Sequence, residues 1–301
     1  MTVYSPSRLN TFENCPRQFE YRYIQKLERT RESIEAYVGK RVHEILERLY
    51  HHVARHRRPP SLRQILDRYE SDWRLRWHDE VEIIREGTSE DDYRERGVRC
   101  LENYYRRHYP FDDGETVAIE HPVHFQLDGD GRYRARGILD RLVRRGPGHY
   151  EIHDYKTGSW LPPQSQLDSD RQLAMYQIGV QQAYPDAREV DLVWHYLSFD
   201  RTLRSRRSEP ELRTLSEATI GLIDTIETTR VFPAKPSALC RWCEYRDLCP
   251  DARLPVGAPS AELDPPPLGL EPRDSGAEST GGIGPPEADP PLPSGTQLSL
   301  L

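Results

Sequence analysis

The positions of the cysteines constrain the architecture of this chain most. Four of the five lie near the two ends of residues 1–254, the part whose composition allows a folded domain. Cys15 follows the first short helical stretch, whereas Cys240, Cys243 and Cys249 form a Cys-x2-Cys-x5-Cys set far along the sequence. Three clustered thiolates need a fourth ligand to complete a tetrahedral site, and Cys15 is the natural candidate. Zinc and an iron–sulfur cluster both accept four cysteines, and the spacing leaves both open. Either group would join the two ends of the fold.

The last 47 residues differ in composition from everything before them. Residues 255–301 hold 11 of the 25 prolines, 7 of the 19 glycines and no aromatic residue. Seven acidic residues against one arginine place −6 of the formal net charge of −7 here, which leaves residues 1–254 near −1. Such a segment buries too little apolar surface to offset its ordering entropy, so we expect residues 255–295 to be a disordered linker. The acidic balance of the whole chain therefore says little against nucleic-acid binding.

Residues 1–254 are predicted to form one mixed α/β domain, with a sheet covered by helices. Period-3.6 patterns predict helices over 6–14, 33–56, 61–79, 90–108, 168–183 and 211–229, and alternating runs predict strands over 117–127, 132–143, 149–155 and 190–199. We expect Trp73, Trp77 and Cys100 to face the core. The start of the sequence lacks the pattern of a signal peptide, and no apolar run reaches the ~18 residues of a membrane span, so a cytoplasmic protein is expected.

The candidate catalytic residues are concentrated on two neighbouring predicted strands. Asp140 ends the first, and Asp154 and Lys156 end the second, where side-chain alternation puts these two on one face and Tyr155 on the other. If the strands pair as a hairpin through residues 145–148, Asp140 approaches Asp154. Two converging carboxylates bind a hard divalent cation such as Mg²⁺ or Mn²⁺, which can polarise a phosphodiester and lower the pKa of a bound water. The alternative for any single Asp-x-Lys is an exposed surface ion pair.

Further motifs accompany this pair in a fixed order. Gly39-x-x-x-His43-x-x-Leu46-Glu47 lies upstream on a helical stretch, and Gln172 and Tyr176, four residues apart, share one helix face downstream. Together with Gly137-x-x-Asp-Arg and Asp-Tyr-Lys-Thr-Gly, this set resembles the RecB-like branch of the PD-(D/E)XK nuclease superfamily over nearly all of residues 4–250. The resemblance implies a restriction-endonuclease-like core, that is, a mixed central sheet flanked by helices.

The resemblance also implies a role for each matched residue. His43, Asp140 and Asp154, with the backbone carbonyl of Tyr155, match metal ligands. Lys156 matches the catalytic lysine, and Gln172 and Tyr176 match residues that organise the site and contact DNA. Taken singly, His43 is better explained as a helix histidine with a structural partner. For Gln172 and Tyr176, a helix face packed on the sheet is compatible with a role in the site.

The cysteines carry a second resemblance. One N-terminal Cys followed by C-terminal Cys-x2-Cys-x5-Cys-Pro is similar to the [4Fe–4S] module of AddB-type and small CRISPR-associated RecB-like nucleases. The segment from Tyr4 through Cys15-Pro-Arg-Gln-Phe-Glu-Tyr fits the N-terminal half of that module. This implies an iron–sulfur module built from about residues 4–25 and 236–252, with zinc as the alternative.

The leading functional hypothesis is a metal-dependent DNA nuclease of repair or recombination, an exonuclease acting on single strands or DNA ends. The exonuclease assignment comes from the His43 motif through the resemblance. A CRISPR-adaptation nuclease and a non-catalytic iron–sulfur module that binds DNA ends are the alternatives. The chain contains no Gly-x4-Gly-Lys-[Ser/Thr] loop, so unwinding of duplex DNA would need a helicase partner.

The final six residues, 296–301, form a separate candidate. Gln297, Leu298, Leu300 and Leu301 belong to Gln-Leu-Ser-Leu-Leu, which resembles the peptide by which bacterial replication and repair proteins bind the sliding clamp. In that mode Gln297 would hydrogen-bond at the pocket rim, and the three leucines would fill apolar subsites. The alternative is a chance tail or one that folds back onto the nuclease.

Overall fold

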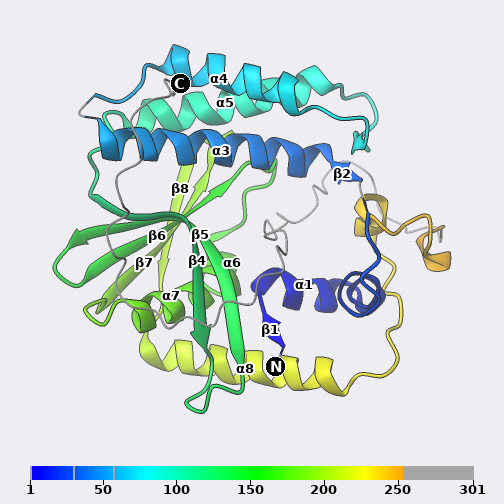
Figure 1. Ribbon diagram of the computed structural model, residues 1–301. Coiled ribbons are helices and arrows are strands. Elements are labelled where there is room, and N and C mark those ends of the chain that lie inside the picture. The colour runs from blue at the N-terminus through cyan, green and yellow to red at the C-terminus, as the bar shows by residue number, and fades with distance from the viewer. Residues whose placement is uncertain (1, 30, 57, 254–301) are drawn as a thin grey trace, which may run out of the picture.

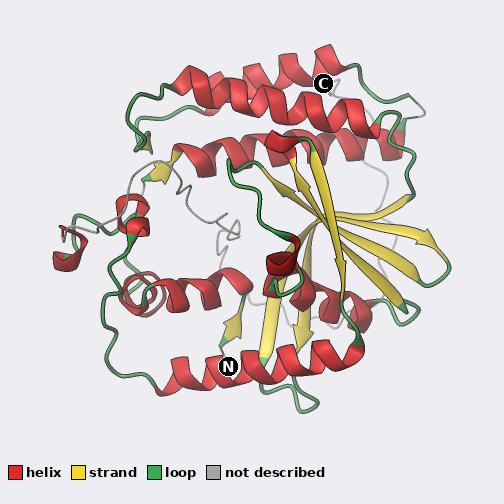
Figure 2. Ribbon diagram, turned by 180° about the vertical axis from the view of Figure 1, so that it is seen from behind, coloured by secondary structure: helices red, strands yellow, loops and turns green. Residues whose placement is uncertain are grey.

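A six-stranded mixed β-sheet lies between two helical layers (Figures 1 and 2). The computed structural model describes residues 2–29, 31–56 and 58–253. The sheet runs in the order β1-β5-β6-β7-β8, with β4 on the remaining edge of β5. Its strands are β1 (Val3–Tyr4), β4 (Glu115–Gln126), β5 (Arg134–Gly146), β6 (His149–Lys156), β7 (Glu189–Tyr196) and β8 (Arg201–Arg206). Only β1 with β5 and β6 with β7 pair in parallel within this sheet.

The helices divide between the two faces of the sheet. One layer holds α3 (Ile34–Arg55), α4 (Leu62–Arg76) and α5 (Glu90–His108), and the other holds α1 (Pro6–Asn14), α7 (Arg171–Ala183) and α8 (Glu209–Thr228) (Figure 1). The short elements are α2 (Pro16–Phe19), a π-helix (Glu20–Ile24), β2 (Glu32–Ser33), β3 (Val81–Glu82), α6 (Gln164–Leu167) and 3₁₀ turns at Leu197–Phe199, Ala238–Trp242 and Pro250–Arg253. This arrangement confirms the predicted mixed sheet flanked by helices.

Polar residues at the helix starts explain why the elements begin where they do. Ser5, Ser33 and Asp170 each accept a hydrogen bond from a backbone N–H of the first turn of α1, α3 and α7. Ser61 and Ser89 form capping boxes at α4 and α5. These side chains satisfy amide groups that the helix itself cannot pair. The capping by Asp170 starts α7 at Arg171, three residues later than the periodicity predicts.

The sequence analysis missed β8 and the two-residue strands β1, β2 and β3. The predicted strand 190–199 ends at Tyr196, continues as a 3₁₀ turn and returns as β8, which pairs antiparallel with β7. The sequence of β8, Arg-Thr-Leu-Arg-Ser-Arg, lacks the apolar alternation of a half-buried strand. It forms the edge of the sheet, where charged side chains discourage pairing with other chains. Because arginines interrupt the apolar alternation, the hydrophobicity pattern does not indicate this strand.

Apolar clusters fill both faces of the sheet. One lies between the sheet and the α7–α8 layer, and the other lies under α3, α4 and α5. Trp73 and Cys100 are fully buried in the second cluster, and Trp77 packs against it, as the sequence predicts. The side chain of Tyr155 belongs to this same cluster, whereas its neighbours Asp154 and Lys156 reach the α7 side, which confirms the predicted alternation.

The two strands that carry the acidic residues pair and then separate. β5 pairs with β6 from Arg141 to Gly146 and with β1 at Arg134 and Ala135. Among the described residues, 136–140 of β5 have no strand partner on that edge. Figure 1 shows β4 and β5 diverging from β6 and β7 there. We call the opening the fork; it is where the hairpin predicted through residues 145–148 brings Asp140 beside Asp154.

The two ends of the described chain lie against each other. Arg22 of the π-helix forms a bidentate ion pair with Glu244, at 2.6 Å to both carboxylate oxygens. The Tyr245 hydroxyl donates to the Leu27 carbonyl (3.0 Å), and the Arg17 Nε donates to the Phe232 carbonyl (2.8 Å). The two cysteine-bearing ends of the described chain are therefore in contact.

Residues 255–301 lie outside the described residues, and so do the predicted linker 255–295 and the terminal peptide 296–301. In the described part of the chain, no helix combines the length and the apolar character that crossing a membrane requires.

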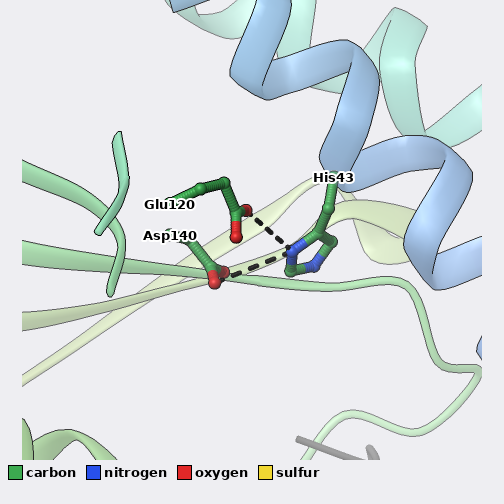
Figure 3. Close-up of side chains that lie close together, drawn as sticks. All are labelled: His43, Glu120 and Asp140. Atoms are coloured by element: carbon green, nitrogen blue, oxygen red, sulfur yellow. Dashed lines mark ion pairs between the residues drawn. The ribbon is translucent and has the colours of Figure 1, made fainter. Parts of the chain in front are cut away.

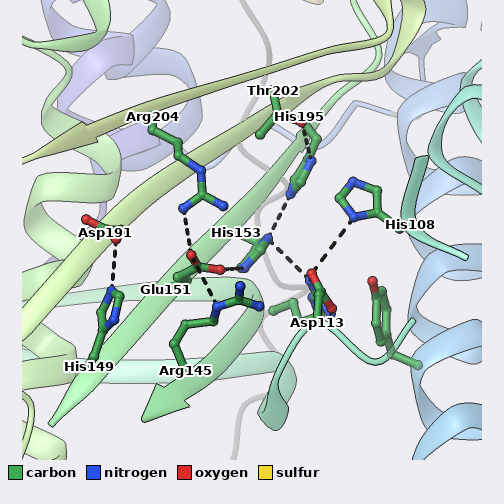
Figure 4. Close-up of polar contacts among 12 residues, drawn as sticks. His108, Asp113, Arg145, His149, Glu151, His153, Asp191, His195, Thr202 and Arg204 are labelled. Carbon is green, nitrogen blue, oxygen red and sulfur yellow. Dashed lines mark hydrogen bonds and ion pairs between the residues drawn. The ribbon is translucent and has the colours of Figure 1, made fainter. Parts of the chain in front are cut away.

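A chain of buried polar residues crosses the sheet beneath α5 (Figure 4). His153 lies between Glu151 (Nε2 to Oε2, 3.1 Å) and His195 (Nδ1 to Nε2, 2.7 Å), and His195 continues to Thr202 (3.3 Å). Because the Glu151 carboxylate accepts, His153 carries its proton on Nε2 and accepts at Nδ1 from His195. Both imidazoles are thus neutral when their bonds are satisfied. His108 stands against the ring of His195, with centroids 5.0 Å apart.

This histidine chain predicts acid-sensitive stability. Burial lowers the pKa of His108 to about 4 and holds the pKa values of His153 and His195 well below their usual range. Unfolded histidines titrate near 6.5, so the unfolded state takes up more protons below that pH. The stability these groups contribute is present above pH ~6.5 and falls as the pH drops toward 4. We expect the thermal midpoint to decline over this window.

The control for this measurement is His51→Gln, which alters an exposed histidine and should leave the pH profile unchanged. His108→Gln should flatten the profile between pH 6.5 and 4.5. A midpoint that stays constant from pH 7 to 5 in the parent protein would contradict the assignment of neutral buried imidazoles.

Candidate active site

The fork between β5 and β6 brings the two predicted aspartates together. The backbone N–H of Tyr155 donates to Asp140 Oδ2 at 2.8 Å, in place of the strand pairing that ends at Arg141 and His153. Asp140 therefore lies beside the strand end that carries Asp154. The sequence predicted this approach from the hairpin, and the register confirms it.

Asp154, Lys156 and Gln172 form a closed set of contacts. Lys156 Nζ lies 2.8 Å from Asp154 Oδ2. The side-chain amide of Gln172, on α7, donates to Asp154 Oδ1 (3.2 Å) and accepts from Lys156 (3.3 Å). One amide from the helix layer thus contacts both strand residues.

Tyr176 packs into the fork one turn further along α7. A Cβ atom on Gly137 would lie 2.0 Å from Tyr176 Cε1, so only glycine admits the ring at this position. Two of the sequence motifs are therefore in direct contact. The ring is buried, with 7 % of the residue exposed, and it closes the α7 side of the fork.

His43 enters the fork from α3 (Figure 3). Its Nε2 lies 2.9 Å from the Tyr155 carbonyl oxygen, and its Nδ1 lies 3.7 Å from Asp140 Oδ1. The ring also meets the Tyr155 ring edge-on, with centroids 5.6 Å apart. Gly39, one turn earlier on α3, lies against the Thr157 hydroxyl. The helix motif and the strand motif thus face each other across the opening.

Glu120 of β4 is the residue that sequence reasoning missed. Its Oε1 lies 3.5 Å from His43 Nδ1, and it completes a group with His43 and Asp140 whose ligand atoms all lie within 4.8 Å of one another. Its backbone has φ of +44°, which is left-handed and unfavourable for a residue with a side chain. Strain of this kind concentrates at functional sites. In the sequence, Glu120 is one charge in an alternating run, and nothing there separates it from a solvated strand face.

The electrostatics of the fork favour a cation. Burial raises the pKa values of Asp140 and Asp154, against the opposing effects of His43 and Lys156 respectively. Burial alone would lower the pKa of His43, but the charges of Asp140 and Glu120 raise it to about 9. The pKa of Lys156 is also raised, because Asp154 outweighs its burial. Three carboxylates share a buried space, and the protons of His43 and Lys156 offset only part of their charge.

The residues fit a divalent metal ion. His43 Nδ1 is buried and has no hydrogen-bond partner among the described residues. With Nε2 donating to the Tyr155 carbonyl, a neutral ring points its Nδ1 lone pair at two carboxylates, which is unfavourable unless a proton or a metal ion lies between them. His43, Glu120 and Asp140 could hold such an ion, with Asp154 adjacent. Oxygen donors with one imidazole suit Mg²⁺ or Mn²⁺.

Comparison with known proteins agrees with this geometry. The family model of the PD-(D/E)XK nuclease superfamily matches residues 3–250. The chain belongs to this superfamily. A crystal structure from Eubacterium rectale, named "Putative exonuclease", aligns with a TM-score of 0.50 at 13 % identity, over 81 % of this chain and 87 % of that one. At that identity the likeness concerns the fold alone.

The structure of SSO0001 also aligns, at 17 % identity over 64 % of this chain and 95 % of that one, with a TM-score of 0.30 that is too low to bear on the argument. None of the curated proteins compared with the chain matches it.

PD-(D/E)XK nucleases use divalent metal ions. A second group of possible ligands differs from the fork in its charge balance (Figure 4). His149, Glu151 and Asp191 also bring three ligand atoms within 4.8 Å of one another. However, Arg204 Nη1 lies 2.6 Å from Glu151, and Arg206 Nε lies 2.7 Å from Asp191. Arginines already neutralise these carboxylates, so we interpret the group as an ion-pair network of the sheet.

The four cysteines of this nuclease surround one pocket of about 90 Å³. Cys15, Cys240, Cys243 and Cys249 line it together with Trp242, and none of the four is in a disulfide. The backbone N–H of Ser237 donates to Cys240 Sγ at 3.4 Å, as amides do to metal-bound thiolates. Burial raises the pKa of the Cys243 thiol to about 12, so its thiolate needs a nearby cation. The predicted union of Cys15 with the C-terminal set is thus present as a shared pocket.

The structure brings His43, Asp140, Asp154, Tyr155, Lys156, Gln172 and Tyr176 into the fork. The candidate clamp residues Gln297, Leu298, Leu300 and Leu301 lie outside the described residues.

Glu120 generates a prediction about metal affinity. If Glu120 is a ligand, Glu120→Gln should weaken Mn²⁺ binding by roughly 10-fold or more, since it removes one anionic oxygen from the group. Isothermal titration of Mn²⁺ into the metal-free protein measures this. Glu115→Gln, which neutralises an exposed carboxylate on the same strand, is the matched control. Equal affinities in the two variants would exclude Glu120 from the metal site.

Proposed function

We propose that this protein is a metal-dependent deoxyribonuclease that hydrolyses phosphodiesters at the fork. The observation that carries the proposal is the meeting of Asp140, Asp154 and Lys156 with His43 at the point where β5 and β6 part. Three motifs far apart in sequence supply these side chains. An exposed surface ion pair, the alternative for Asp154 and Lys156, is not supported, because their side chains are only 6 % and 11 % exposed.

Each residue has a proposed role that follows from its contacts. His43 Nδ1, Glu120, Asp140 and Asp154 would hold the metal ion. The Tyr155 carbonyl, the further ligand that the resemblance implies, accepts from His43 Nε2 and would fix the orientation of the ring. A divalent cation bound there supplies Lewis-acid polarisation of the phosphodiester and a water of lowered pKa.

The other residues act directly on the substrate or on one another. Lys156 keeps its proton, because Asp154 raises its pKa, and so presents a fixed positive charge to the charge that develops on the phosphate oxygens. Gln172 holds the Lys156 ammonium and the Asp154 carboxylate in one orientation through its two hydrogen bonds. Tyr176 excludes water from the α7 side of the fork.

We further propose that the enzyme degrades single strands or DNA ends, in repair or recombination. The His43 motif supports an exonuclease, and the name of the Eubacterium rectale protein agrees with it. A helicase would have to supply single strands from duplex DNA. Binding of the sliding clamp through residues 296–301 stays a prediction from the sequence and is not required for hydrolysis.

The activity is tested with end-labelled linear DNA and closed circles in Mg²⁺ or Mn²⁺. Lys156→Ala and Asp154→Asn should each lower the hydrolysis rate by about 100-fold or more, because each removes a charge aimed at the reacting phosphate. Lys235→Ala, which changes a lysine bonded to the Glu13 carbonyl, is the control and should keep full activity.

Two outcomes of this assay contradict the proposal in different ways. Retained activity in Lys156→Ala would overturn the site assignment. Cleavage of closed circles as fast as linear ends would agree with a nuclease but would contradict the exonuclease assignment.

We also propose that the four cysteines hold a [4Fe–4S] cluster. In a tetrahedral zinc site, Zn–S bonds of about 2.3 Å bring the sulfurs within roughly 3.8 Å of each other. In the described part of the chain, no three of these sulfurs lie within 4.8 Å of one another, and they surround a pocket of about 90 Å³. The spacing supports a group larger than one ion. It would fasten the two ends of the fold, next to the Arg22–Glu244 ion pair.

Anaerobic purification tests the cluster. The protein should be brown, with a charge-transfer absorbance band that Cys240→Ser abolishes. Cys100→Ser, at the buried cysteine of α5, should retain the colour and serves as the control. Colourless protein that carries roughly one zinc per chain would show that zinc fills the pocket.

A further inference from the structure

An exposed tryptophan stands on the loop that follows the lysine of the fork. Trp160 is 48 % exposed, and the described residues offer its ring no aromatic contact. Tyr109, another exposed aromatic, differs in this respect because its ring packs against Tyr105 and Phe111. An indole offers a large, flat apolar surface on which a ligand ring can stack.

The loop holds Trp160 in place. On its N-terminal side, the Thr157 carbonyl accepts a hydrogen bond from Ser198 Oγ at 2.9 Å. On its C-terminal side, Leu161 packs against the apolar core and Pro162 is buried. Only Gly158, Ser159 and Trp160 lie between these anchors. The indole is therefore presented from a short, restrained segment and loses little conformational entropy when a ligand binds.

The position of Trp160 relates it to the scissile phosphate. Trp160 is four positions after Lys156, so the two Cα atoms are at most about 14 Å apart. Nucleotides in one strand of B-form DNA are spaced by about 3.4 Å along the axis, so this limit on the Cα separation corresponds to about four nucleotides. A strand with a phosphate at Lys156 is therefore long enough to reach Trp160.

We propose that Trp160 stacks on an unpaired base of the substrate strand, beside the phosphodiester that is cut. The inference rests on the proposed nuclease function and deepens it, because it names the feature of DNA that is recognised. Every base offers a π-face, so such stacking is tolerant of sequence. In a duplex both faces of an internal base are covered by its neighbours. Trp160 thus selects single strands and frayed ends over intact duplex.

The test measures binding without cleavage, in the Lys156→Ala protein with Mg²⁺. A fluorescein-labelled 20-nucleotide single strand reports affinity by anisotropy. Adding Trp160→Ala should weaken binding by about 5- to 150-fold, the loss expected when one base–aromatic stack is removed. Trp160→Phe, which keeps an aromatic face, should recover most of the affinity. Tyr109→Ala removes an exposed aromatic that has its own ring partners and should change nothing.

A base-by-base scan separates stacking from a merely structural role. A set of strands, each with one abasic position, should show one position, or two adjacent ones, where the Lys156→Ala protein loses affinity. The further Trp160→Ala variant should be indifferent to that position. Equal affinity of the two proteins, or a position-specific loss that persists without Trp160, would overturn this inference alone. Failure of the Lys156→Ala protein to bind any strand would overturn it together with the proposed function.

Discussion

The backbone of Tyr155 ties the fork together. The Tyr155 N–H donates to the Asp140 carboxylate, and the Tyr155 carbonyl accepts from His43, so one residue joins β5, β6 and α3 through its backbone. A bond from an amide to a buried carboxylate is among the stronger hydrogen bonds in a protein. It replaces the strand pairing that β5 and β6 give up where they part. This hydrogen bond keeps the Asp140 carboxylate beside the end of β6 that carries Asp154.

The side chain of Tyr155 holds this backbone segment from the other side of the sheet. Its hydroxyl lies 3.3 Å from that of Tyr104, which lies 2.6 Å from the Tyr50 hydroxyl, and Arg141 stacks over the Tyr50 ring at 3.9 Å. The Arg141 guanidinium is buried and reaches Asp113. The same strand thus presents its acidic and lysine side chains to α7 and a polar aromatic network to α5. The packing of Tyr155 on the α5 side therefore helps to hold Asp154 and Lys156 in position on the α7 side.

Most of the fork was predictable because its residues obey simple periodicities. Alternation along β6 put Asp154 and Lys156 on one face, and the short turn after β5 made the approach of Asp140 follow from hairpin pairing. The i, i+4 spacing put Gln172 and Tyr176 on one helix face. The contact of Gly137 with Tyr176 shows why two of these motifs occur together. The spacing of the cysteines likewise predicted that the ends of the fold meet.

What the sequence could not supply depends on local backbone geometry. Glu120 joins the fork through a left-handed residue in the middle of a strand, which no periodicity indicates. β8 is polar because it is an edge, so it lacks the signal of a half-buried strand. The bridging of Asp154 and Lys156 by one amide depends on the distance between α7 and β6, which tertiary packing sets. The identity of the group among the cysteines depends on sulfur-to-sulfur distances that spacing leaves open.

The proposed chemistry depends on a metal ion that binds in the fork. Anomalous diffraction from crystals soaked in Mn²⁺ tests it most directly, because it locates the ion without relying on activity. We expect a peak between His43, Glu120 and Asp140, with Asp154 in contact and oxygen ligands at about 2.0–2.4 Å. A peak only at His149, Glu151 and Asp191, or a fork that stays empty at saturating Mn²⁺, would contradict it.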